Sequence, residues 1–229
     1  MPVLPGPPPI EITLRRSART RRFSLRVSRL DGRVTLSLPV RARESEAMTF
    51  ARSQEGWLRQ ALAKMAVPAG VALGAVLPVE GRLVTLMAGT GRSVRLDGET
   101  LVVPGDPDQV GARVAGFLKT LARDRLIAAS DRYAAALGVG FRGVTLRDTR
   151  SRWGSCSAKG GLMYSWRLIM APPDVLDYVA AHEVAHLVQM NHSAAFWTVV
   201  DGLYPGWQVQ RRWLHGQGQT LHAYRFGGD

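Results

Sequence analysis

The sequence predicts an α+β fold, because stretches of alternating apolar and polar residues precede a series of helical patterns. Two of the alternating stretches turn at an Asp-Gly pair, at residues 31–32 and 97–98. Glycine accepts the positive φ that a tight hairpin turn requires, so each pair predicts a β-hairpin. The longest helical pattern covers residues 106–138, with an Asp-Pro pair at its start and Gly138 at its end. We therefore expect small antiparallel sheets followed by packed helices.

The part of the chain before residue 105 is expected to be mainly β. Residues 1–9 are rich in proline and glycine, which predicts a flexible lead-in. A single helical pattern covers residues 44–65, is interrupted at Gly56 and ends before Pro68. We expect residues 10–105 to form a basic, mainly β amino-terminal region with this one helix.

Residues 106–229 are expected to form a second domain in which helices dominate. Two strand patterns, at residues 143–149 and 162–171, flank a turn-rich segment. Further helical patterns follow, at residues 172–190, 193–204 and 206–217.

Cysteine content and apolar run lengths indicate a cytoplasmic protein. Cys156 is the only cysteine, which excludes an intramolecular disulfide and fits a reducing compartment. The proline-rich start lacks the continuous apolar core of a secretory signal. No apolar run approaches the ~20 residues that span a bilayer, so we expect no membrane segment.

The net charge of +12 is concentrated near the amino terminus, where residues 1–60 carry twelve arginines against five acidic residues. Such a region can attract nucleic acid by long-range electrostatics. The other interpretation is a solvated basic surface, because no aromatic-interleaved recognition motif accompanies the arginines.

Three histidines close together in the sequence predict a metal site. His182 and His186 are four residues apart, which places both imidazoles on one face of a helix. Glu183 projects about 100° around the helix, beside the metal, where it can take a proton from water. His192 supplies a third ligand if the helix stops near Asn191, a residue that tolerates the left-handed conformation. Ser193 would then cap the next helix.

The spacing H-x-x-x-H-x-x-x-x-x-H is that of the metzincins, but two features exclude that clan. Gln189 stands where metzincins have glycine, and no methionine follows Met190 to form a Met-turn.

The neighbouring residues give a closer resemblance. The chain contains SRWGSCSAKGGLMYSWRLIMAPPDVLDYVAAHEVAHLVQMNHSAAFW, followed by YPGWQVQRRWL. This segment resembles the YgjP-like zinc metallopeptidases, a bacterial family related to SprT-like and Wss1-like proteases. The match is strong over residues 143–216 and weaker over the amino-terminal hairpin. The resemblance implies a zincin-like domain, a small antiparallel sheet with an active-site helix. It also implies one Zn²⁺ ligated by His182, His186 and His192, with Glu183 as catalytic base.

These observations predict a zinc peptidase that hydrolyses peptides or proteins. We expect the substrate to lie extended along a sheet edge at residues 162–168. A second stabiliser of the reaction is open among four residues: Arg152, Tyr178, Tyr204 and His215. Two other functions stay open: a DNA-associated SprT-like protease that docks through its basic amino-terminal region, and a non-catalytic module with a structural zinc. Oligomeric state and natural substrate are not predicted.

Overall fold

The computed structural model describes residues 1–28, 32–63 and 69–227. Its contacts divide the chain into two compact units, Met1–Val67 and Pro68–Asp229. The sequence placed a boundary near residue 105, but the strands between the two positions bury their apolar side chains in the core of the second unit. The α+β class is confirmed.

The first unit is a four-stranded sheet with the strand order β1-β2-β4-β3. Its strands are β1 (Val3–Leu4), β2 (Ile10–Arg16), β3 (Ser24–Val27) and β4 (Val34–Leu38). β3 and β4 pair antiparallel, as the predicted hairpin requires, although Asp31 of its turn lies outside the described residues. β2 and β4 are parallel. Residues 1–9 include β1, whose Leu4 is fully buried against this sheet's core.

Two helices cover this sheet where the sequence predicts one, α1 (Glu44–Ser53) and α2 (Glu55–Ala63). The interruption falls at Gln54, two residues before Gly56, because Gln54 leaves helical geometry at φ −104° and ψ 10°. Ala51 and Leu58 turn toward the sheet and are fully buried. The predicted helix end before Pro68 lies outside the described residues.

The second unit begins with another four-stranded sheet, in the order β6-β7-β9-β8. Its strands are β6 (Val76–Val79), β7 (Arg82–Gly89), β8 (Arg95–Asp97) and β9 (Thr100–Pro104). The predicted hairpin at the second Asp-Gly pair joins β8 and β9. The expectation of a purely antiparallel sheet is wrong, because β7 and β9 are parallel. A short parallel pair, β5 (Ala69–Gly70) with β13 (Tyr224–Arg225), lies apart from this sheet.

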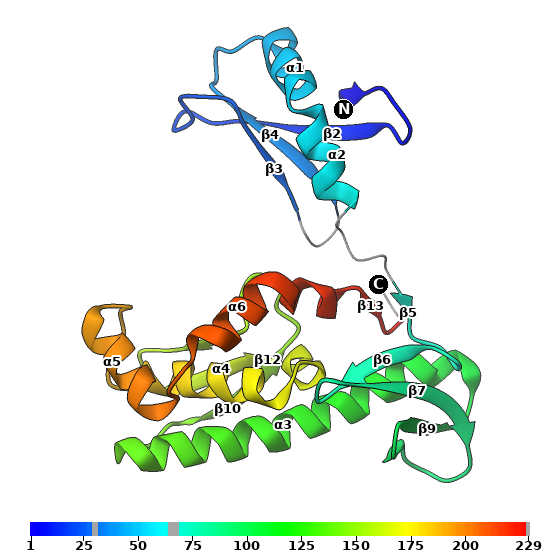
Figure 1. The fold of residues 1–229 in the computed structure, drawn as a ribbon, viewed down its shortest axis with the longest axis vertical. Helices are drawn as coiled ribbons and strands as arrows, with labels where there is room; N and C mark the ends of the chain where they lie inside the picture. The colour runs from blue at the N-terminus through cyan, green and yellow to red at the C-terminus, as the bar shows by residue number, and fades with distance from the viewer. Residues whose placement is uncertain (29–31, 64–68, 228–229) are drawn as a thin grey trace. The chain divides into compact units, whose positions relative to one another are not determined.

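The longest predicted helix is present as η1 (Pro107–Gln109) followed by α3 (Val110–Leu137). Gly138 ends it in the left-handed conformation at φ 67°, as predicted. In Figure 1 α3 runs along the whole second unit. Within the described ranges, no helix has both the length and the apolar character needed to cross a membrane.

A three-stranded sheet follows, in the order β10-β12-β11. Its strands are β10 (Gly143–Arg147), β11 (Gly154–Cys156) and β12 (Gly161–Ser165). β11 is a strand inside the segment predicted as turns. The sheet is mixed, because β10 runs parallel to β12 while β11 is antiparallel to it. A parallel pair needs a crossover of about a dozen residues, and residues 148–160, which include β11, provide it.

This order corrects the predicted substrate edge at residues 162–168. β12 is the central strand, flanked on both sides, and residues 166–170 form the 3₁₀ helix η2 (Trp166–Met170). The free edges of the sheet are β10 and β11. Four helical segments complete the unit: α4 (Pro173–Ala185), α5 (Ala194–Leu203), α6 (Gln208–Gln217) and η3 (Gly218–His222).

Candidate metal centre

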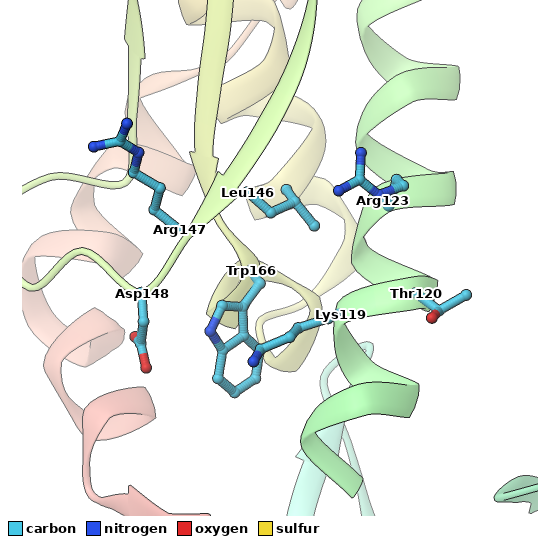
Figure 2. A pocket seen from close by; sticks show the side chains of 7 residues that line it. All are labelled: Lys119, Thr120, Arg123, Leu146, Arg147, Asp148 and Trp166. Atoms are coloured by element: carbon cyan, nitrogen blue, oxygen red, sulfur yellow. The ribbon is translucent and has the colours of Figure 1, made fainter. Parts of the chain in front are cut away.

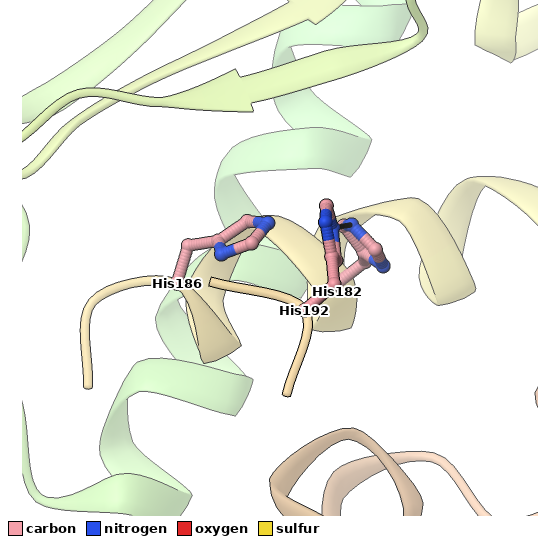
Figure 3. Close-up of side chains that lie close together, drawn as sticks. All are labelled: His182, His186 and His192. Atoms are coloured by element: carbon pink, nitrogen blue, oxygen red, sulfur yellow. Dashed lines mark hydrogen bonds between the residues drawn. The ribbon is translucent and has the colours of Figure 1, made fainter. Parts of the chain in front are cut away.

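The three predicted histidine ligands meet at the end of α4 (Figure 3). One nitrogen from each of His182, His186 and His192 lies within 4.8 Å of the other two. α4 ends at Ala185, earlier than the sequence predicts, so His186 is its C-cap residue. His186 keeps helical dihedrals, φ −66° and ψ −16°, which preserves the one-turn spacing from His182.

The turn that returns His192 to the helix differs from the prediction. Glu80 is the only non-glycine residue with positive φ in the described part of the chain, so Asn191 is not left-handed. Instead, the backbone tightens after Ala185, because the Val188 amide donates to the Ala185 carbonyl at 3.2 Å, only three residues back. The Asn191 side chain then accepts from the Ser193 amide at 3.2 Å. Ser193 occupies the predicted N-cap position of α5, but its side chain makes no capping hydrogen bond.

The imidazoles of His182 and His186 have a protonation that suits metal binding. The His186 Nδ1 lies 2.9 Å from the Gln189 carbonyl oxygen, which can only accept, so Nδ1 carries the proton and Nε2 is left as a ligand atom. Burial lowers the pKa of His186. Burial, with the charges of His186 and His192, lowers the pKa of His182 to about 3. His182 is therefore neutral near pH 7.

The arrangement of the nitrogens fits a cation. The Nε2 atoms of His182 and His192 face each other at 3.1 Å, a geometry that a shared metal ion would satisfy with both lone pairs. Three imidazoles are a donor set typical of zinc. Among the residues described, no cysteine or carboxylate joins the three histidines in this group, so the protein leaves a coordination position open.

Glu183 lies buried against β11. Glu183 is 6% exposed, and this burial raises the pKa of its carboxyl group to about 8. The charge of Arg152 and a hydrogen bond from the Cys156 backbone N–H oppose this increase. Gly154 makes room for it, because a Cβ there would lie 2.5 Å from Oε1 of Glu183. Sequence patterns do not indicate this contact, because residues 154–156 have the composition of a turn.

Aromatic side chains surround the histidines. Phe196 stacks on His186 with ring centroids 4.4 Å apart, and Trp197 stacks on His192 at 5.8 Å. Trp207 in turn stacks on Trp197 at 4.2 Å. Such packing fixes ring orientation and limits water around the cluster.

The four candidates for a second stabiliser occupy different places. Tyr178 is buried on α4, with its ring 5.9 Å from that of His182. Tyr204 lies behind it, 6.4 Å from Tyr178. The charge of Arg152 acts on Glu183, whereas His215 is exposed on α6. Tyr178 and Arg152 are thus the two that the structure brings to the centre.

Cys156 is half-buried on β11 and is not built as a nucleophile. Burial, followed by the charge of Glu183, raises the pKa of its thiol. A raised pKa disfavours the reactive thiolate.

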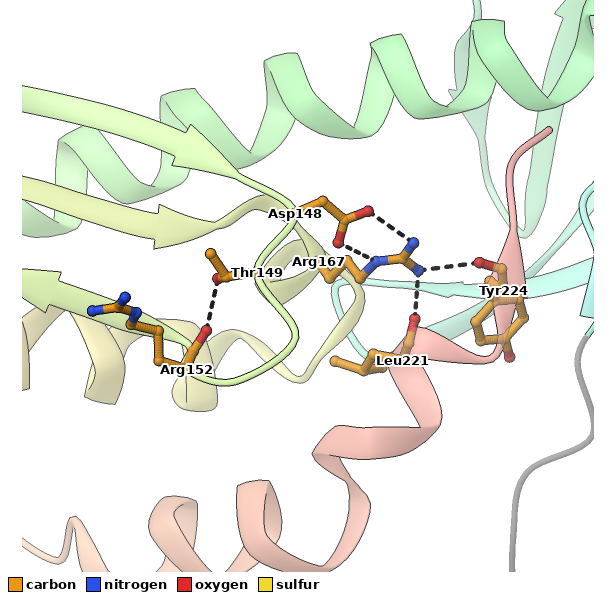
Figure 4. Close-up of polar contacts among 6 residues, drawn as sticks. All are labelled: Asp148, Thr149, Arg152, Arg167, Leu221 and Tyr224. Atoms are coloured by element: carbon orange, nitrogen blue, oxygen red, sulfur yellow. Dashed lines mark hydrogen bonds and ion pairs between the residues drawn. The ribbon is translucent and has the colours of Figure 1, made fainter. Parts of the chain in front are cut away.

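A buried arginine ties the segment before β11 to the carboxyl-terminal segment (Figure 4). The guanidinium of Arg167 donates to both carboxylate oxygens of Asp148, at 2.7 and 3.0 Å. It also donates to the carbonyls of Leu221 at 2.8 Å and Tyr224 at 3.1 Å. Thr149 donates to the carbonyl of Arg152 at 2.8 Å. This network supports the loop that leads into β11, which the sequence did not predict.

A pocket of about 420 Å³ lies away from the histidines, between α3 and the end of β10 (Figure 2). Lys119, Arg123 and Trp166 are among its lining residues. The guanidinium of Arg147 points away from the others in Figure 2, so the basic groups do not converge on one point.

The fold and the three-histidine centre define a class, an α+β protein with a metallopeptidase-type site. The chain belongs to the YgjP-like family, because the sequence model of the YgjP-like metallopeptidase domain matches residues 21–217. A search of curated proteins gave no match. Among solved structures, the crystal structure of the metallopeptidase zymogen of Pyrococcus abyssi abylysin is similar, with 21% identity and a TM-score of 0.37 over 41% of this chain and 95% of that chain. That similarity is too low to carry an argument, so the assignment rests on the family match.

Proposed function

We propose that the protein is a zinc-dependent peptidase in which His182, His186 and His192 hold one Zn²⁺ and Glu183 acts as general base. The observation that supports this most strongly is the convergence of three imidazole nitrogens beside a buried carboxylate that is not itself in the ligand group. A structural zinc site usually closes with a fourth protein ligand, so the three-ligand set favours catalysis over the structural alternative.

The reaction is hydrolysis of a peptide bond. A bound zinc ion supplies Lewis-acid polarisation of the carbonyl and a lowered pKa for water. Glu183 accepts a proton from the attacking water while the water oxygen forms a bond to the carbonyl carbon of the peptide. Glu183 then gives this proton to the amide nitrogen as the C–N bond breaks. Gly154 and the Cys156 amide hold the carboxylate in place for both transfers.

The substrate is proposed to extend along β11, the sheet edge beside Glu183. Backbone hydrogen bonds flank β11 on both sides and join it to β12. The Ser165 N–H donates to the Trp153 carbonyl, and the Ser157 N–H donates to the Gly161 carbonyl. The alternation of an antiparallel ladder then directs the backbone groups of Gly154 outward. An extended peptide can add there as a further strand.

Glu183→Gln tests the catalytic assignment, with zinc added to the full chain. We expect the variant to keep its zinc and to lose about 10²- to 10⁴-fold in kcat on a broad peptide library. Full peptidase activity in a zinc-loaded Glu183→Gln variant would contradict the mechanism.

A second candidate function is that of a DNA-associated protease. The exposed arginines at the end of β2 and just after it favour this function. Arg15, Arg16, Arg19, Arg21 and Arg22 are all exposed. If this unit docks on DNA, replacing them with neutral residues will reduce the salt dependence of binding by about 0.9 in log–log slope for each phosphate that is no longer neutralised. No salt-dependent binding by the unaltered chain would remove this candidate.

A further inference from the structure

An arginine of α6 lies over the aromatic stack beside the histidines. The guanidinium carbon of Arg211 is 5.1 Å from the ring centroid of Trp197 and 5.7 Å from that of Trp207. A planar, weakly hydrated guanidinium is attracted to the faces of indole rings. The stack therefore attracts the Arg211 side chain, although Arg211 is exposed.

The stack connects Arg211 to the metal centre. The ring of Trp197 is 5.7 Å from that of His182 and 5.8 Å from that of His192. Arg211 is thus separated from two proposed ligands by a single indole.

The positive charge of Arg211 has no acidic partner within the described ranges. The salt bridges there join other arginines to carboxylates, and no hydrogen bond of the Arg211 guanidinium is found. A guanidinium that lies over an aromatic ring can still donate through its N–H groups. Those donors match the two oxygens of a carboxylate, which Arg can bind in a bidentate manner.

We propose that Arg211 is a specificity-determining residue that selects peptide substrates carrying a carboxylate near the scissile bond. This inference rests on the proposed peptidase function. The carboxylate can belong to an aspartate or glutamate side chain or to the carboxyl terminus of the substrate. Both sources present the same chemistry to the guanidinium.

The test uses peptides in which one glutamate replaces glutamine at successive positions, each with a free or an amidated carboxyl terminus. With the zinc-loaded full chain, we expect kcat/KM for the best carboxylate-bearing peptide to exceed that of its neutral counterpart. Arg211→Gln should reduce this preference about tenfold, mainly through KM, and Arg211→Lys should keep part of it. Arg212→Gln is the matched control, because Arg212 is the adjacent exposed arginine. The peptide series that loses its preference identifies the source of the carboxylate.

Binding measurements separate this inference from the peptidase proposal. The Kd of the same peptides is measured by calorimetry for zinc-loaded Glu183→Gln, with and without Arg211→Gln. Weaker binding of carboxylate-bearing peptides only in the double variant supports the role of Arg211, even if the unaltered chain cleaves nothing. Equal preference with and without Arg211→Gln, in cleavage or in binding, overturns it.

Discussion

The two larger sheets of the second unit share one connectivity but differ at their edges. In each sheet, three strands that follow one another in the chain form the same pattern: the first is paired parallel to the third, and the second lies on the other side of the third. The orders are β7-β9-β8 and β10-β12-β11. A 3₁₀ segment and a long helix follow each sheet, α3 in one case and α4 in the other. The first unit uses the same order, β2-β4-β3, before α1. One structural pattern thus occurs three times, and only one copy carries the candidate site.

The equivalent edge strands show what distinguishes the site. β8 has the sequence Arg-Leu-Asp and is exposed at all three positions, a charged edge that discourages pairing with other strands. β11 has the sequence Gly-Ser-Cys, is half-buried, and lies against Glu183. The following helices differ in the same way, because α3 buries mostly apolar residues whereas α4 buries Glu183 and has the buried His186 as its C-cap residue. Function here comes from side chains placed on a reused scaffold.

Among changes to these two edge strands, Gly154→Ala should have the largest effect on kcat. A Cβ at this position would overlap the Glu183 carboxylate, and displacement of a reacting group by about 1 Å can cost about 100-fold in rate. We expect kcat to fall about 10- to 100-fold while zinc content is unchanged. Arg95→Ala, at the equivalent position of β8, is the control and should leave kcat unaltered. Equal activity of Gly154→Ala and the unaltered chain would show that β11 does not position Glu183.

Asp148→Asn should destabilise the protein by about 2 kcal/mol, because it removes the charged partner of the buried Arg167. Burial raises the pKa of Asp148, but the hydrogen bonds and charge of Arg167 outweigh this, so the pKa lies below its usual value. Asp177→Asn breaks the more exposed pair with Arg132 and should cost less than about 1 kcal/mol. Urea denaturation measures both. Equal losses of stability in the two variants would mean that the Arg167 network does not support the loop that leads into β11.

A smaller effect is expected from His222, which stacks on Trp153 just before β11. Burial, with the charge of Arg167, lowers its pKa to about 4. The unfolded chain binds this proton at higher pH than the folded chain, so stability falls as the pH decreases from about 6.5 to 4. We expect His222→Gln to flatten this part of the stability–pH curve by on the order of 1 to 2 kcal/mol, measured by urea denaturation. An unchanged slope in the variant would assign the loss to other groups.

The sequence predicted the local parts of the site and missed those that depend on distant pairing. His182, Glu183 and His186 follow from helical spacing, and His192 follows from a short turn, so four positions within eleven residues could be predicted together. The turn itself was predicted wrongly, because Asn191 is not left-handed and the Gln189 carbonyl in the turn is bound by the His186 side chain. Contacts such as Gly154 with Glu183 and Arg211 with Trp197 join separate segments, and nothing in local periodicity indicates them. The parallel strand pairs were missed for the same reason.

The most direct test of the metal centre is the zinc content of the purified chain after dialysis against zinc and then against metal-free buffer. We predict that the unaltered chain retains one zinc per chain. The variants His182→Gln, His186→Gln and His192→Gln should each bind zinc at least tenfold more weakly and lose it on dialysis. His215→Gln, which alters a histidine outside the cluster, should keep the full content. A chain that retains no zinc, or that retains it unchanged after His192→Gln, would contradict the assignment of this site.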